Sequence, residues 1–118
     1  MNPILIADAD PAFRNALRLV LKHRLGVAEV REAGDVQGLI CAMSESQPEL
    51  LLLDWRLYGA PAPETCRLLQ KAYPSLKIVL LSPSADDAVI AREAGAGFIH
   101  KGASPEQLVA TLAPLLKD

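Results

Sequence analysis

Three continuous apolar runs constrain the fold of this chain more than any other feature. They are ILIA at residues 4–7, LLLL at 50–53 and IVLL at 78–81. Runs of this length, bounded by polar residues, are typical of strands buried on both faces, as in a parallel sheet. Residues 27–33 predict a weaker strand of edge character, and residues 97–100 predict a short fifth strand.

Helical patterns lie between the predicted strands. Asp10 followed by Pro11 is typical of a helix N-terminus, and Ser104-Pro105 with Gln107 is typical of a capping box at the start of the last helix. The other helices are expected over residues 35–46, 64–72 and 85–94, the last of these closed by Gly95. The alternation indicates an α/β protein of the (βα)₅ type, with a doubly wound parallel sheet.

Length and composition limit the alternatives. The 118 residues predict one domain over residues 1–118, and the apolar fraction of 51% is sufficient for a core. The net charge of −2 argues against direct binding to nucleic acid. Cys41 and Cys66 predict buried, reduced thiols and no disulfide framework. The apolar runs are too short to cross a membrane, and no signal peptide is evident, so we expect a cytoplasmic protein without membrane contact.

Polar residues follow the predicted strands where each apolar run stops. They are Asp8, Asp54, Ser82 and Lys101. In an open parallel sheet the carboxyl ends of the strands meet at one edge, which is where such sheets bind ligands. Two carboxylates there could hold Mg²⁺, and one could act as a nucleophile towards phosphorus. The ammonium and the hydroxyl would then contact the phosphoryl oxygens, so the four residues predict a phosphoryl site.

These four residues, with ILIADADPAFR, LLLDWRL and GFIHKGASPEQL around them, resemble the receiver domains of response regulators. The similarity covers essentially the whole chain and is greatest to receivers of helix-turn-helix regulators. It implies a flavodoxin-like fold with strand order 2-1-3-4-5. It also implies that Asp54 is the phosphoacceptor, that Lys101 bridges to the phosphoryl group, and that Ser82 and Phe98 switch position. The implied Mg²⁺ ligands are Asp8, Asp54 and the backbone carbonyl of Arg56.

The resemblance also implies the partners. A histidine kinase or a phosphotransfer protein would supply the phosphoryl group, and the chain itself would not be an enzyme beyond weak self-dephosphorylation. A C-terminal DNA-binding output domain outside this chain would read the switch. A homodimer could form through the first and last helices, where Leu19 falls off the apolar face of its helix.

The sequence departs from the receiver pattern near the predicted site. Ala9 replaces the second of two adjacent acids, and loss of that ligand should weaken Mg²⁺ binding by at least about 10–100-fold. Asp10 alternates with Asp8 and could replace that ligand, but its place before Pro11 favours a helix cap. The remaining departures are Tyr58 and Ala62 in the loop after Asp54, Pro83 (which has no N–H) after Ser82, and a segment between Ser82 and Lys101 that is short by roughly one helical turn.

Three functional hypotheses therefore remain at the level of the sequence. The first is a working receiver phosphorylated on Asp54. The second is a pseudo-receiver, which keeps the fold and acts as a phosphorylation-independent interaction module. The third takes Asp8-Ala9-Asp10 as the nucleophile and general acid of a haloacid-dehalogenase-like phosphatase, although Asp54 would then have no role.

Overall fold

A computed structural model describes residues 3–57 and 61–116 of the chain. All strand pairs in its five-stranded sheet are parallel, and the order is β2-β1-β3-β4-β5. The α/β fold and the strand order 2-1-3-4-5 are therefore confirmed. The strands are β1 (Ile4–Ala7), β2 (Val30–Ala33), β3 (Leu50–Asp54), β4 (Lys77–Ser82) and β5 (Gly97–His100).

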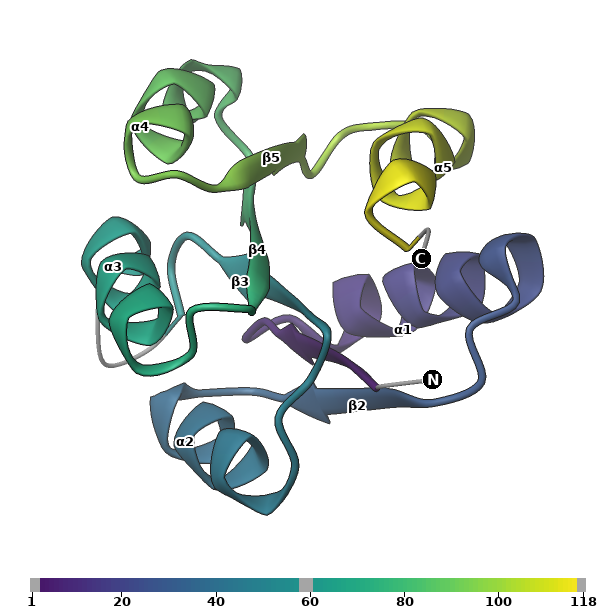
Figure 1. Cartoon of the computed structure of the whole chain (residues 1–118). Coiled ribbons are helices and arrows are strands. Elements are labelled where there is room, and N and C mark those ends of the chain that lie inside the picture. Colours follow the sequence, from purple (N-terminus) through teal and green to yellow (C-terminus); the bar gives the residue numbers. More distant parts are fainter. Residues whose placement is uncertain (1–2, 58–60, 117–118) are drawn as a thin grey trace.

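Helices cover both faces of the sheet. Figure 1 shows α1 and α5 on one face and α2, α3 and α4 on the other. This two-sided cover explains why the central strands are apolar at every position rather than at alternate ones. The helices are α1 (Pro11–Leu19), α2 (Val36–Glu45), α3 (Ala62–Ala72), α4 (Ala88–Glu93) and α5 (Pro105–Leu112).

The core is divided by the sheet into two clusters. Leu51, Leu53 and Leu80 belong to the cluster under α2, α3 and α4, whereas Leu52 and Leu81 belong to the cluster under α1 and α5. All five side chains are at most 1% exposed. Successive side chains of a strand point to opposite faces, so a run such as LLLL supplies both clusters at once.

The predicted helix caps are present. The Asp10 side chain accepts a hydrogen bond from the Ala12 N–H at 2.9 Å, and Ser104 and Gln107 form the reciprocal capping box. Gly95 follows the end of α4 with a φ of 77°, in the left-handed region that glycine adopts without strain. The position of Asp10 matters for the site, because its carboxylate is engaged with the backbone of α1.

Several boundaries differ from the sequence-based expectations. β2 begins at Val30 rather than at residue 27, because Val27 instead bonds back to the Leu21 carbonyl after the turn at Gly26. The expected helix over residues 85–94 is a 3₁₀ turn over Ala85–Asp87 followed by α4. The helix expected over 64–72 begins two residues earlier, at Ala62.

The helices at the two ends of the chain finish in non-α turns. A π-helical turn over Val20–Arg24 continues α1, and a 3₁₀ turn over Ala113–Leu116, which contains Pro114, follows α5. Leu19 is 42% exposed, as expected for a residue outside the apolar face of α1.

The cysteines were expected to be buried, and this is correct for only one of them. Cys66 is buried on α3, whereas Cys41 is exposed on α2, because it lies on the solvent-facing side of that helix. Within the described residues, no helix is long and apolar enough to cross a membrane.

Candidate functional site

The four residues predicted at the strand ends lie at the same edge of the sheet. Asp54 and Ser82 are the last residues of β3 and β4, while Asp8 and Lys101 directly follow β1 and β5. Asp8, Asp54 and Ser82 are 0%, 4% and 1% exposed, which is unusual for polar side chains without a role in structure or function. The parallel sheet therefore gathers these four residues into one pocket, as expected.

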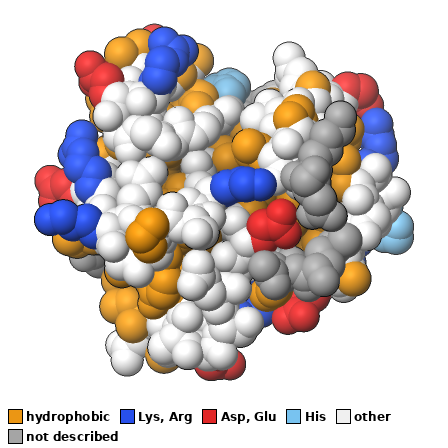
Figure 2. All heavy atoms as spheres, in the orientation of Figure 1, with side chains coloured by type: hydrophobic (Ala, Val, Ile, Leu, Met, Phe, Trp, Pro, Cys, Tyr) orange, Lys and Arg blue, Asp and Glu red, His pale blue; other side chains and the backbone are white. Residues whose placement is uncertain are grey.

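The Lys101 ammonium joins the two carboxylates. Its Nζ lies 2.7 Å from Asp8 Oδ2 and 3.0 Å from Asp54 Oδ1. The same atom lies 4.9 Å from the centre of the Phe13 ring, a distance that permits a cation–π contact. Figure 2 shows a basic and an acidic side chain side by side near the middle of the visible face.

Backbone groups orient both carboxylates. The Asp10 N–H donates to Asp8 Oδ1 at 2.8 Å, and the Arg56 N–H donates to Asp54 Oδ1 at 3.3 Å. No hydrogen bond between described residues reaches Asp54 Oδ2. Among the described residues, no donor occupies the lone pairs of that oxygen, which makes it the candidate nucleophile.

Burial and pairing shift the pKa values of two groups. Burial is the main cause that raises the pKa of Asp8 above its ordinary value of 3.8, and the contacts with Lys101 and the Asp10 N–H offset only part of this effect. Burial alone would lower the pKa of Lys101, but its contacts with Asp8 and Asp54 outweigh burial and raise that pKa above 10.5. Lys101 therefore remains a cation at neutral pH.

Ser82 is engaged away from the two carboxylates. Its hydroxyl donates to Asp87 Oδ2 at 2.6 Å and accepts the Ser84 N–H at 3.0 Å. Pro83, between them, has no N–H to offer. The Ser82 hydroxyl and the Ser84 N–H are thus both engaged within this loop, and neither is directed to Asp54.

The pocket suits a hard cation, and it offers the two carboxylates that the sequence predicted, Asp8 and Asp54. Among the described residues, no three His, Cys, Asp or Glu side chains are close enough to bind one metal ion together. Asp8 Oδ2 has no well-directed hydrogen-bond donor in that part of the chain, although Lys101 lies beside it. Because Mg²⁺ is usually held by one or two carboxylates with water and phosphate oxygens, Asp8 and Asp54 fit it.

The chain matches a known protein family over nearly its whole length. Residues 4–113 match the family described as "Response regulator receiver domain". The chain belongs to this family. A match over that range covers all five strands and all four strand-end residues.

Curated relatives are transcriptional response regulators. The chain is 33% identical over 105 residues to the transcriptional activator protein ExaE of Pseudomonas putida, covering 86% of this chain and 49% of that protein. It is 32% identical over 117 residues to the DNA-binding response regulator MtrA of Mycolicibacterium smegmatis, covering 97% of this chain and 50% of that protein. The chain thus spans about half the length of these relatives.

Solved structures agree on the fold. The isolated receiver domain of RcsB from Salmonella enterica, solved with the phosphomimetic BeF₃⁻, superposes with a TM-score of 0.87 at 23% identity, covering 97% of this chain and 87% of that one. A putative response regulator from Chloroflexus aurantiacus gives a TM-score of 0.85 at 26% identity, covering 98% and 97%.

The other predicted positions can be placed in this receiver, with one exception. Phe98 is half-buried against the cluster under α2, α3 and α4, and its switching role stays a prediction. Ala62 begins α3 and is 1% exposed. Asp10 caps α1, which confirms the preferred of its two interpretations. Tyr58 lies outside the described residues.

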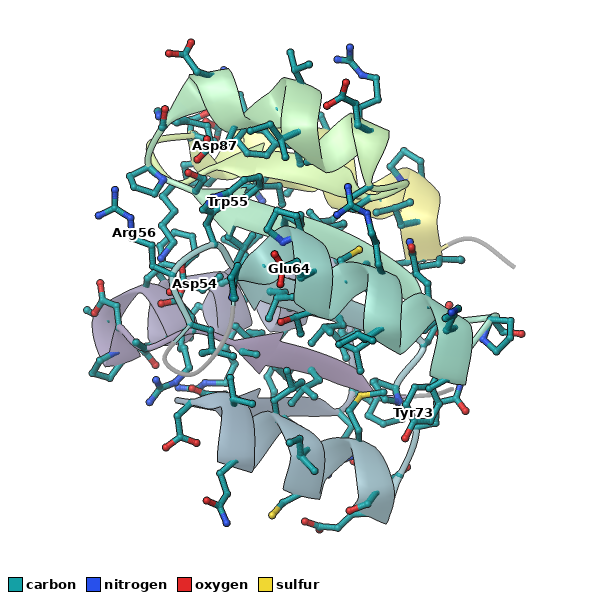
Figure 3. All side chains as sticks on the ribbon, turned by 90° about the vertical axis from the view of Figure 1, so that its left-hand side faces the viewer. Asp54, Trp55, Arg56, Glu64, Tyr73 and Asp87 are labelled. Carbon is teal, nitrogen blue, oxygen red and sulfur yellow. The ribbon has the colours of Figure 1, made fainter. Side chains whose placement is uncertain are left out.

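Two residues at this pocket were not anticipated as contributors. The Arg14 guanidinium donates to the Asp8 carbonyl at 2.5 Å and pairs with Glu32 at 3.0 Å. Asp87, which lies within the segment 85–94 that was expected to be a helix, accepts a hydrogen bond from the Ser82 hydroxyl. Figure 3 shows Asp87 at the same end of the molecule as Asp54 and Arg56. Asp87 lies five positions after Ser82, and no sequence periodicity marks that contact.

Proposed function

We propose that this receiver accepts a phosphoryl group on Asp54 and transmits the change to an output segment or a partner protein. The observation that carries the proposal is the environment of Asp54. Its carboxylate is buried at the end of a central strand, with Oδ1 held by Lys101 and the Arg56 N–H and with Oδ2 unengaged by any described donor.

The chemistry follows from that arrangement. Asp54 Oδ2 attacks the phosphorus of a phosphohistidine, an O–P bond forms, and the P–N bond breaks as the imidazole nitrogen leaves and takes up a proton. The product is an acyl phosphate on Asp54. Lys101, already 3.0 Å from Asp54, offsets the added negative charge on the phosphoryl oxygens. The chain acts here as a phosphoacceptor in signalling rather than as an enzyme with turnover.

Asp8, Asp54 and the backbone carbonyl of Arg56 would hold Mg²⁺. When bound, the ion supplies positive charge that stabilises the phosphoryl oxygens during transfer. Ala9 removes one carboxylate from the usual set, so we propose weak binding, with water completing the coordination. The fixed Lys101 ammonium supplies part of the charge compensation in any case.

The relatives suggest the partners. MtrA is named as a DNA-binding response regulator and ExaE as a transcriptional activator, and each is about twice the length that this chain matches. We propose a histidine kinase or a phosphotransfer protein as the donor, and a DNA-binding output domain as the reader in transcription regulation. Receivers of this kind work in the cytoplasm, and we place this one there. Ser82 and Phe98 would carry the switch.

A pseudo-receiver is the second candidate, and it rests on specific observations. Ala9 removes a carboxylate, Pro83 removes a backbone donor, and the Ser84 N–H is engaged by Ser82. In this alternative the Lys101 ion pairs simply close the pocket, and the chain binds its partners without phosphorylation. The haloacid-dehalogenase alternative is not proposed, because Asp10 caps α1 and the chain belongs to the receiver family.

Trp55 provides the experiment that separates the two candidates. It is the only tryptophan in the chain and directly follows Asp54. A working receiver predicts a saturable change in its fluorescence when Mg²⁺ and beryllofluoride are added together, and none in an Asp54→Asn variant. An unchanged spectrum at high concentrations of both reagents would favour the pseudo-receiver.

A further inference from the structure

We propose that Asp87 is a positioning residue that latches Ser82 away from the phosphorylation site, so that the receiver must break the Ser82–Asp87 hydrogen bond to reach its switched state. This inference rests on the proposed function, because the latch opposes a response to a phosphoryl group on Asp54. It concerns a residue outside the four that define the receiver site.

The Ser82 hydroxyl can donate only one hydrogen bond at a time. A serine hydroxyl has a single proton, and here that proton is donated to Asp87 Oδ2 at 2.6 Å. The oxygen also accepts the Ser84 N–H at 3.0 Å. Ser82 therefore cannot donate to a phosphoryl oxygen on Asp54 while it remains bonded to Asp87.

The hydrogen bond from Ser82 to Asp87 is a strong one. An O–H donor to a carboxylate at this separation belongs to the strong, charge-assisted class of hydrogen bond. Ser82 is 1% exposed, so water competes poorly for its proton. Ser82 therefore favours Asp87 until another anion of comparable strength is present, and a phosphoryl group on Asp54 is such an anion.

The local backbone explains why the pair meets. A 3₁₀ turn over Ala85–Asp87 follows β4, and the Asp87 N–H bonds to the Ser84 carbonyl at 3.2 Å. This turn brings Asp87 back over the strand end. Asp87 directly precedes α4, so the latch joins the end of β4 to the start of that helix.

Asp86 provides a matched control. It has the same charge, lies in the same 3₁₀ turn and is exposed, and no hydrogen bond among the described residues involves its side chain. Replacing Asp86 or Asp87 by alanine changes the net charge equally. Only the second substitution removes the acceptor from Ser82.

The test is a Trp55 fluorescence titration with beryllofluoride in the presence of Mg²⁺. Asp87→Ala should lower the midpoint concentration about tenfold, which is the effect of losing one hydrogen bond to a charged group. Asp87→Asn, which keeps a neutral acceptor, should give an intermediate midpoint. Asp86→Ala should match the wild type. In a Ser82→Ala background, Asp87→Ala should have no further effect, which distinguishes a latch from a general loosening of the loop.

The outcomes separate this inference from the proposed function. Equal midpoints for wild type, Asp87→Ala and Asp86→Ala would overturn the latch and leave phosphorylation of Asp54 standing. A fluorescence change in Asp87→Ala but not in the wild type would support a strong latch on a site that can be phosphorylated. No fluorescence change in either protein would overturn the proposed function and the latch together. Equal effects of Asp87→Ala with and without Ser82 would overturn the latch.

Discussion

At the scale of single residues, the pocket contains two carboxylates and one ammonium, so it carries a formal charge of one negative unit. Asp8 and Asp54 are both within 3.0 Å of Lys101, and Ala9 adds nothing where receivers usually carry another acid. The sequence identified this deficit correctly, because an alanine after a strand end can be read directly. It did not identify Arg14 or Asp87 as contributors, since their contacts depend on side-chain rotamers and on the path of a loop.

Restoring the missing carboxylate should restore the affinity for Mg²⁺. Ala9→Asp is expected to tighten Mg²⁺ binding by about 10–100-fold, because it supplies a ligand beside Asp8. Titration of Trp55 fluorescence measures this. Asn15→Asp, which adds the same charge on the exposed surface of α1, is the control and should change little. Equal affinities for Ala9→Asp and the wild type would show that the pocket does not bind the ion.

The raised pKa of Asp8 should appear in the pH dependence of stability. Between pH 3.8 and the raised value, the folded state binds the Asp8 proton more tightly than the unfolded state. Protonated Asp8 therefore makes its full contribution to the free energy of unfolding below pH 3.8. This contribution is lost as pH rises through the pKa of Asp8 in the folded state. The free energy of unfolding of wild type minus that of Asp8→Asn should therefore fall from pH 4 to pH 7, as followed by urea unfolding. A rising difference would contradict the burial of this carboxylate.

At the scale of elements, the strands were easier to predict than the segments that follow them. The runs at β1, β3 and β4 are apolar at every position because helices cover both faces of the sheet, and no polar residue obscures them. The caps of α1 and α5 were equally clear. The segment 85–94 was harder, because the 3₁₀ turn over Ala85–Asp87 continues directly into α4, and no residue marks the boundary between them.

The cap of α1 gives a prediction at this scale. Asp10→Ala should lower the free energy of unfolding by about 0.5–2 kcal/mol, because the Ala12 N–H loses its acceptor. Its affinity for Mg²⁺ should stay that of the wild type, since the carboxylate serves the helix and not the pocket. Urea unfolding and the Trp55 titration measure the two quantities. A clear loss of Mg²⁺ affinity with normal stability would assign Asp10 to the metal instead.

At the scale of the whole molecule, the sheet separates two cores and collects one polar pocket at its edge. The pocket exists because five parallel strands end together, so its geometry depends on the integrity of both cores. The chain spans about half the length of its curated relatives.

The cores should dominate the stability. Leu52→Ala, in a side chain that is 0% exposed, should cost about 2–5 kcal/mol in the free energy of unfolding. Leu68→Ala, at a side chain that is 69% exposed, should stay within about 0.5 kcal/mol of the wild type. Urea unfolding measures both, and comparable losses at the two sites would contradict the burial that we describe.

Phosphorylation of Asp54 is the central claim, and mass spectrometry of the intact protein tests it most directly. The wild type, incubated with Mg²⁺ and a small phosphodonor such as acetyl phosphate, should gain the mass of one phosphoryl group. Asp54→Asn should gain none, and Asp8→Asn should gain it more slowly. Absence of the mass gain in the wild type, or its persistence in Asp54→Asn, would contradict the account.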